Sequence, residues 1–254
     1  MRLGTSLFTV AVVAVLNAAP AQASAIIDLI DGDFGSANGA LYQWTNTQPT
    51  GTGVMNTFVR VQNRGIEQGY NHSLGGQSPW DTKAGIHTHD IQMTDLVVKT
   101  ITGVDYFEFL LDINESSGHD REWLSLDNVQ IYTSGGPITS PDESFSHLGD
   151  LRFNSDAGPD GDTTVNLDYT RNSGSGSGDM FLYVPVSLFA GTLPSDYVYF
   201  YSRFGDSLSS EAGFEEWGLL PGAGQGPPVV PEPASMVLLG TGLLLVVRRL
   251  RPRA

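Results

Sequence analysis

Cysteine is absent from the 254 residues, so neither a disulfide framework nor a thiolate metal site can stabilise this protein. Basic residues are few as well: 13 Lys and Arg stand against 28 Asp and Glu, a formal net charge of −15. Such a surface repels nucleic acid and anionic lipid head groups, which excludes nucleic acid as a partner. No stretch between the two chain ends has the pattern of a long amphipathic helix.

Motifs of nucleophilic and nucleotide chemistry are missing too. No serine is centred in G-x-S-x-G, and no Walker-type or dinucleotide-type glycine loop occurs. The alternating serines and glycines of residues 173–178 are typical of a flexible loop before a strand. His87 and His89 would share one face of a strand, but the aspartate and the further histidine of a metallo-hydrolase motif are not in place. We interpret the pair as the polar start of a strand.

The N-terminus has the three parts of a secretory signal peptide. Arg2 supplies the positive charge, residues 7–16 form an apolar run too short to span a bilayer, and Ala21-Gln22-Ala23 fits a cleavage site. A buried N-terminal helix is the alternative. The sequence therefore predicts a signal peptide over residues 1–23 and passage through the Sec translocon.

The C-terminus combines a proline-rich stretch, an apolar segment and a basic end. After Pro231, Glu232 and Pro233, the 14 apolar residues 234–247 would form about 21 Å of helix, against a bilayer core of about 30 Å. This transmembrane helix is short, so the arginines after it must extend toward the interface. They also predict a cytoplasmic C-terminus and so an acidic domain outside, and they are Arg248, Arg249, Arg251 and Arg253.

This order of a Pro-Glu-Pro motif, an apolar helix and an arginine cluster resembles the PEP-CTERM sorting signal of Gram-negative bacteria. The resemblance implies recognition by an exosortase, which removes the tail from an inner-membrane-anchored precursor and delivers the protein to the cell surface or extracellular matrix. It also implies a host that makes exopolysaccharide, and so exopolysaccharide as a partner. The alternative is a plain tail anchor in which the Pro-Glu-Pro is incidental.

Between the two ends, residues 24–221 predict one exported all-β domain, a jelly-roll-like β-sandwich, joined by a Gly/Pro linker at residues 222–230 to the sorting signal at residues 231–254. Residues 24–233, which remain once the signal peptide and the tail from Ala234 are removed, keep eight basic and 28 acidic residues, a net charge of −20. Expected strands cover residues 41–45, 54–62, 91–101, 104–113, 123–133, 164–169, 180–189 and 197–204. We expect a tight hairpin at Thr102-Gly103 and, because of Pro185, an edge strand or bulge in 180–189.

For the strand 104–113, the sequence predicts which side chains face the core and which face the other way. Its alternate residues share a face toward the core, while Glu108 and Asp112 lie on the other face. The core-facing residues are Phe107, Phe109, Leu111 and Ile113.

Two acidic segments are candidate calcium sites, because a hard cation takes six to eight oxygen ligands. In residues 154–162, Asp156, Asp160 and Asp162 alternate around a turn glycine, although the ends of an EF-hand pattern are wrong. The second is an acidic concentration around the loop of residues 114–120, made up of Asp112, Glu115, Asp120, Glu122 and Asp127. Calcium is thus a possible cofactor, and the alternative for the first loop is a solvated Asp-Gly turn.

Three function classes remain open. The leading hypothesis is a non-enzymatic adhesive or scaffolding protein of the surface or matrix, with no catalytic residues. A calcium-dependent carbohydrate-binding module is the alternative, in which Trp44, Trp80, Trp123 and Trp217 would stack on sugars. A secreted hydrolase using two carboxylates is the third class, but the sequence selects no such pair.

Overall fold

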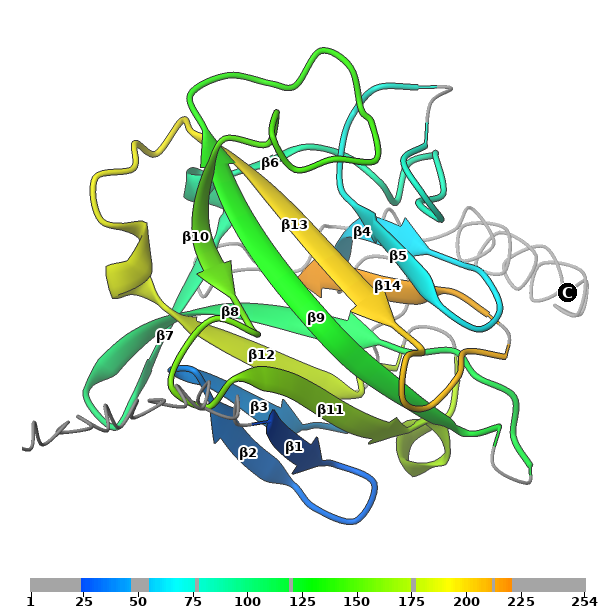
Figure 1. Cartoon of the computed structure of the whole chain (residues 1–254). Coiled ribbons are helices and arrows are strands. Elements are labelled where there is room, and N and C mark those ends of the chain that lie inside the picture. The colour runs from blue at the N-terminus through cyan, green and yellow to red at the C-terminus, as the bar shows by residue number, and fades with distance from the viewer. Residues whose placement is uncertain are drawn as a thin grey trace, which may run out of the picture.

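The computed structural model describes residues 24–46, 55–75, 78–118, 121–174, 177–211 and 213–220. Nearly all regular structure in them is β-strand, arranged in two sheets, which agrees with the predicted sandwich (Figure 1). Its jelly-roll-like character stays a prediction. The predicted signal peptide and transmembrane helix lie outside the described residues. Among the residues that are described, no helix is long and apolar enough to cross a membrane.

Sheet A has seven strands. In spatial order its main path is β1 (Ser24–Asp28), β11 (Asp162–Asp168), β9 (Trp123–Ser134), β13 (Tyr197–Phe204) and β5 (Glu67–Tyr70). Beside this path, β10 (Asp150–Asn154) pairs with β9, and β6 (Ile91–Gln92) pairs with β13. The first strand, β1, runs parallel to β11.

Sheet B also has seven strands. Its main path is β2 (Phe34–Ala37), β3 (Ala40–Trp44), β12 (Met180–Pro185), β8 (Val104–Asp112), β14 (Glu215–Leu219) and β4 (Asn56–Val61), and β7 (Val97–Ile101) pairs with β8. Short 3-10 helices interrupt the strands: η1 (Met93–Asp95), η2 (Tyr169–Asn172) and η3 (Val186–Phe189).

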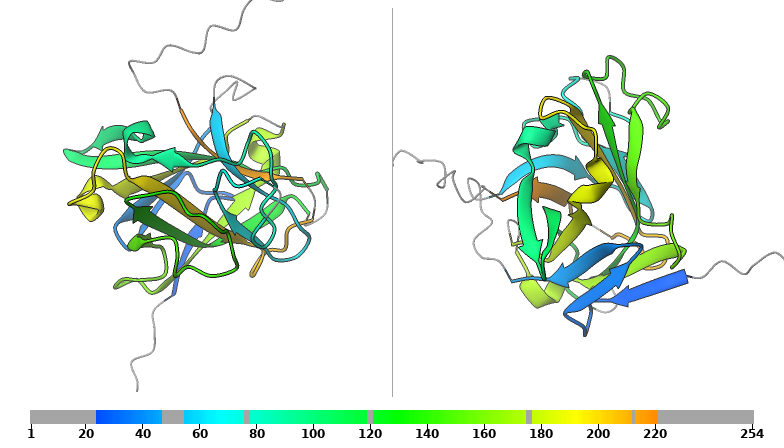
Figure 2. Two further views of the ribbon diagram at one scale, coloured as in Figure 1. Left: turned by 90° about the horizontal axis from the view of Figure 1, so that it is seen from above. Right: turned by 90° about the vertical axis from the view of Figure 1, so that its left-hand side faces the viewer.

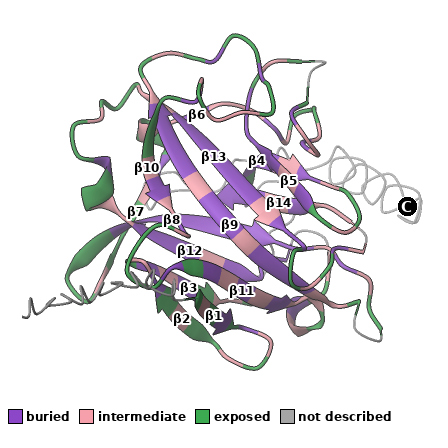
Figure 3. Ribbon diagram, viewed as in Figure 1, coloured by how far each residue is buried: buried purple, intermediate pink, exposed green. Residues whose placement is uncertain are grey.

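The apolar core lies between the two sheets (Figures 2 and 3). Phe200 of sheet A contacts rings from three strands of sheet B: its centroid lies 5.7 Å from that of Phe58, 5.0 Å from Phe109 and 4.7 Å from Trp217. Edge-on and tilted aromatic pairs of this kind add to the stabilisation that burial provides. The predicted core face of β8 is confirmed, since all four of its residues belong to this core.

The predicted hairpin at Thr102-Gly103 is confirmed. Ile101 pairs with Val104, and the two turn residues have φ of 49° and 85°. Positive φ at both positions is the requirement of a two-residue hairpin turn whose twist matches that of its strands.

Two strand predictions were wrong in detail. Residues 91–101 do not form one strand, because the Asp95 carboxylate accepts a 2.7 Å hydrogen bond from Gln92 N and closes the turn η1, so that β6 joins sheet A and β7 joins sheet B. Pro185 marks neither an edge nor a bulge, since β12 lies between β3 and β8. Pro185 is the last residue of β12, where a missing N–H removes only the final rung of the ladder.

A second apolar cluster covers the outer face of sheet A. It is formed by Tyr70, Tyr132, Ile138, Leu148, Tyr199 and Tyr201. Trp80 packs here, with its ring centroid 5.9 Å from Tyr70 and 5.5 Å from Phe145. The four tryptophans therefore do not form one stacking platform: Trp217 is in the core, and Trp44 lies under the Arg171 guanidinium, 4.1 Å from its ring centroid.

Candidate functional site

Two glutamates meet between the sheets at one end of the core. Glu67 begins β5 and lies opposite Phe204 in the register of sheet A, while Glu215 begins β14 and lies opposite Val61 in sheet B. Paired residues of neighbouring strands point to the same face, and both Phe204 and Val61 belong to the core. Both glutamates therefore point inward, and neither is exposed to solvent.

Glu115, in the loop after β8, completes what we name the interior carboxyl cluster: Glu67, Glu115 and Glu215. Its exposed fraction is 5%, and its Oε2 accepts a 3.0 Å hydrogen bond from Glu211 N. Glu67 Oε2 accepts a 2.7 Å hydrogen bond from Asn63 N. The cluster is thus tied to the loops on both sides of it.

Among the described residues, no cationic side chain contributes to the electrostatic environment of Glu215. Burial raises its pKa well above the usual value, and the carboxyl groups of Glu67 and Glu115 raise it further. The backbone of Asn114 opposes this rise by hydrogen bonding to the carboxylate, but the neighbouring Glu67 carboxyl favours the protonated form of Glu215. The pKa of Glu67 is also raised, chiefly by burial and further by the charge of Asp81. Burial of two neighbouring carboxyl groups therefore favours uptake of a proton by the pair.

The nearby arginine of β4 does not reach this pair. Arg60 forms an ion pair with Glu216 at 3.7 Å, and its guanidinium lies over the Phe214 ring, 4.2 Å from the centroid. Arg60 and Glu216 are opposite each other in register, next to the inward pair of Val61 and Glu215, so they occupy the other face of sheet B.

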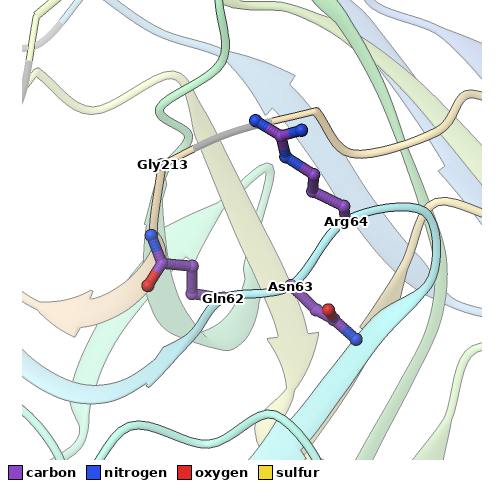
Figure 4. Close-up of a pocket in the computed structure, with 4 residues that line it drawn as sticks. All are labelled: Gln62, Asn63, Arg64 and Gly213. Carbon is purple, nitrogen blue, oxygen red and sulfur yellow. The ribbon is translucent and has the colours of Figure 1, made fainter.

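A surface depression of about 380 Å³ lies beside the cluster (Figure 4). It is lined by Gln62, Asn63, Arg64 and Gly213. Gly213 has φ of 83°, and a Cβ there would collide with the backbone carbonyl of Asn114. Only glycine fits this position, which lets the last loop run close to the end of β8.

The chemistry open to the cluster is limited by its geometry. A glycosidase needs two carboxyl groups about 5–10 Å apart with a sugar between them. Glu67 and Glu215 are instead completely buried between the sheets, so their carboxyl groups present no surface to a substrate. Within the described part of the chain, no group of three or more His, Cys, Asp and Glu side chains converges to hold a metal ion. The arrangement fits proton sharing that joins the two sheets.

The first predicted calcium loop, residues 154–162, is named here the acidic loop. It contacts the tip of the β2–β3 hairpin, where Asn38 and Gly39 form a two-residue turn with φ of 49° and 84°. Asn38 Nδ2 donates to Ser155 O at 2.6 Å and to Gly161 O at 2.7 Å. Two carbonyl oxygens of the acidic loop thus accept hydrogen bonds from the Asn38 amide nitrogen, in the positions where a calcium loop would offer them to a cation.

The predicted aspartates of the acidic loop also accept internal hydrogen bonds. Asp160 Oδ2 accepts from Asn38 N at 2.7 Å. Asp156 accepts from Asn128 Nδ2 at 2.6 Å and from Thr163 N at 3.1 Å, and burial raises its pKa. Asp162 is exposed at the start of β11. Calcium binding by these residues stays a prediction.

The second predicted calcium loop lies partly outside the described residues, so calcium binding there stays a prediction. Asp112 is fully buried on β8, where its Oδ1 accepts from Asn114 Nδ2 at 3.2 Å, and Asp120 lies outside the described residues. His87 and His89 lie in a turn before β6 rather than on a strand, with the buried Thr88 between them.

Sequence reasoning missed Glu67, Glu215 and Asn38. For the glutamates the available signal was weak, because a carboxylate on a strand is ordinarily placed on the solvent face. For Asn38 a signal existed: Asn-Gly between short apolar segments is a strong hairpin indicator. Its contact with the acidic loop joins residues 122 positions apart, so no local pattern reveals it.

The predicted sorting residues lie outside the described residues, and comparison with known families tests the resemblance that they carry. The PEP-CTERM protein-sorting motif matches residues 229–251, which contain Pro231, Glu232 and Pro233 and the arginines 248, 249 and 251. No match was found among curated proteins or among solved structures. The predicted resemblance is confirmed, and the motif indicates export followed by exosortase processing of a membrane-anchored precursor. The chain is therefore an exported protein that carries a PEP-CTERM protein-sorting motif.

Proposed function

We propose that the exported domain is a non-enzymatic adhesive or scaffolding component of the cell surface or extracellular matrix, associated with exopolysaccharide. The observation that carries this proposal is the sorting motif at residues 229–251, which follows an all-β domain. The bonding of the interior polar groups also supports a structural role. Glu67, Glu215 and Asn38 all join strands or loops of the domain to one another.

Composition suits this role. A net charge of −20 in the exported part keeps the domain soluble and apart from other acidic surfaces, while a neutral polysaccharide is not repelled. Without cysteine, stability outside the cell does not depend on the redox state of a disulfide.

The test is fractionation of the extracellular matrix from producing cells. Wild-type chain should be recovered with the polysaccharide and leave it after enzymatic digestion of that polysaccharide. A chain in which Pro231, Glu232 and Pro233 are all alanine should stay with the inner membrane. Recovery of the wild-type chain only as free protein in the medium would contradict a matrix role while leaving export intact.

Carbohydrate binding is the second candidate, and the outer face of sheet A favours it. Side chains there form a hydrogen-bonded row: Tyr132 OH donates to Gln130 Oε1, and Gln130 Nε2 donates to Asn128 Oδ1 at 2.8 Å. Asn128 in turn donates to Asn154 Oδ1 at 2.9 Å. Tyr132 and Asn128 are buried and hold the row in place, while the half-buried Gln130 and Asn154 are the members that could bond to sugar hydroxyls.

Polysaccharide pull-down with the full chain tests this candidate. Gln130→Ala should reduce retention several-fold, because it interrupts the row. Gln43→Ala removes an exposed glutamine from β3 of sheet B and should leave retention unchanged. Running both with calcium and with chelator tests calcium dependence, and equal retention of the two variants would exclude this face.

A further inference from the structure

The hairpin tip carries the one Asn-Gly pair in the sequence, Asn38-Gly39. Asn-Gly is the peptide sequence most open to deamidation, because glycine has no side chain to hinder attack by its own backbone nitrogen on the asparagine side chain. We propose that Asn38 is a modification site: the folded domain protects it, opening of the hairpin tip exposes it, and deamidation then prevents the tip from closing again.

Protection follows from the contacts of the Asn38 amide. Its Nδ2 is within hydrogen-bond distance of Ser155 O, Gly161 O and Thr163 Oγ1, at 2.6, 2.7 and 3.2 Å. Its Oδ1 accepts a hydrogen bond from Asp160 N at 3.0 Å. Both ends of the amide are therefore held, and the carbon between them cannot turn toward the Gly39 nitrogen until these bonds break.

The reaction proceeds by a cyclic imide and needs only water. The Gly39 nitrogen gives up its proton and bonds to Cγ of Asn38, the Cγ–Nδ2 bond breaks, and Nδ2 leaves as ammonia with that proton. Water then opens the imide at one of its two carbonyls, which gives aspartate or isoaspartate at position 38. Nothing is oxidised or reduced.

Either product is incompatible with the closed tip. Aspartate has no N–H to donate to Ser155 O and Gly161 O, and it places a second carboxylate beside Asp160, whose Oδ2 lies 2.7 Å from Asn38 N. Isoaspartate adds a methylene to the backbone of the turn, so Ala37 and Ala40 no longer pair. A single opening event is thus converted into a lasting change at the edge of sheet B.

Gly158 allows a direct test. A Cβ at this position would collide with Asn38 Oδ1, so Gly158→Ala displaces the amide and leaves the Asn-Gly sequence unchanged. Gly136→Ala is the matched control, because a Cβ there has no atom within 4 Å. Peptide mapping by mass spectrometry after incubation of the full chain at mildly alkaline pH measures deamidation at Asn38.

We expect the wild-type chain to deamidate at Asn38 at least about tenfold more slowly in buffer than in denaturant, which corresponds to an opening free energy of about 1.4 kcal/mol or more. Gly158→Ala should raise the rate in buffer toward the denatured rate, and Gly136→Ala should not. Equal wild-type rates in buffer and denaturant would overturn the proposal. So would a folded Gly158→Ala chain that deamidates at the wild-type rate.

A second experiment tests whether deamidation destabilises the hairpin tip. It does not use Gly158→Ala, so the proposal can be refuted even if that variant fails to fold. Asn38→Asp, the deamidated product, should lower the melting temperature by several degrees. Asn46→Asp makes the same change of charge at an exposed position and should leave it nearly unchanged. Equal melting temperatures of the two variants would show that deamidation does not release the tip.

Discussion

The interior carboxyl cluster and the acidic loop are both rich in acidic residues, yet they are stabilised in opposite ways. In the loop, N–H groups of Asn38, Asn128 and Thr163 satisfy the oxygens of Asp156 and Asp160. In the cluster, burial and the neighbouring Glu67 and Glu115 carboxyls raise the pKa of Glu215, which favours its protonated form. The available donors, rather than the number of carboxylates, decide whether an acidic group holds a proton, a hydrogen bond or a cation.

Of the changes considered, substitution of Asn38 should lower the free energy of unfolding most, because it removes the side-chain amide that donates hydrogen bonds to the acidic loop. Asn38→Gly keeps the positive φ of the turn but leaves two backbone carbonyls without donors, and should lower the free energy of unfolding by about 2 kcal/mol. Asn38→Ala adds the cost of a left-handed conformation and should lower it by about 3 kcal/mol. Urea unfolding of the full chain measures both. A wild-type value for Asn38→Gly would mean that the acidic loop is closed without the hairpin tip.

The second-largest effect on stability is expected from Glu215→Gln, which removes a buried titratable carboxyl group. Because its folded pKa is raised, the protonated form of Glu215 favours folding, so its contribution to stability is fully present below about pH 4.5 and is lost as pH rises toward the folded pKa. The loss is about 1.4 kcal/mol for each unit of raised pKa. Glu215→Gln should remove most of this dependence and be more stable than wild type at pH 8.

The control for this titration is the exposed Glu143, where Glu143→Gln should leave the pH dependence as in wild type. Melting temperatures of the three chains between pH 4 and pH 9 measure the effect. If Glu215→Gln is less stable than wild type at pH 8, the carboxylate has an ionic partner and the proposed difference between the two regions fails.

The smallest effect is expected from calcium at the acidic loop. Since internal donors already satisfy Asp156 and Asp160, Asp162→Asn should change the free energy of unfolding by less than about 0.5 kcal/mol. Millimolar calcium should shift the melting temperature little relative to chelator. A calcium site at a hundred times its dissociation constant would instead add about 2.7 kcal/mol, and an increase of that size lost in Asp162→Asn would show that calcium binds at the acidic loop.

The sequence predicted strands well where apolar and polar residues alternate over a long segment. The strand predicted at 197–204 matches β13 in both bounds, and the core face of β8 was identified residue by residue. Five short strands were missed: β1, β2, β5, β10 and β14. Each has four or five residues, too few for a period of two to stand out from chance.

The candidate site depended on information that no local pattern contains. Glu67 and Glu215 point inward because pairing register aligns them with Phe204 and Val61, and register is set by strands distant in sequence. The acidic loop had visible alternating oxygens, but its partner Asn38 lies on the other sheet. Local chemistry was therefore predictable, whereas its partners depended on the tertiary fold.

The most direct test of the account is mass spectrometry of the C-terminus of the protein recovered from cells. We expect the wild-type chain to end near Pro233 and to lie outside the inner membrane. A chain with alanine at Pro231, Glu232 and Pro233 should keep its Arg253-Ala254 end in that membrane. Intact ends on both chains, in the same membrane, would contradict exosortase processing and leave an ordinary tail-anchored domain.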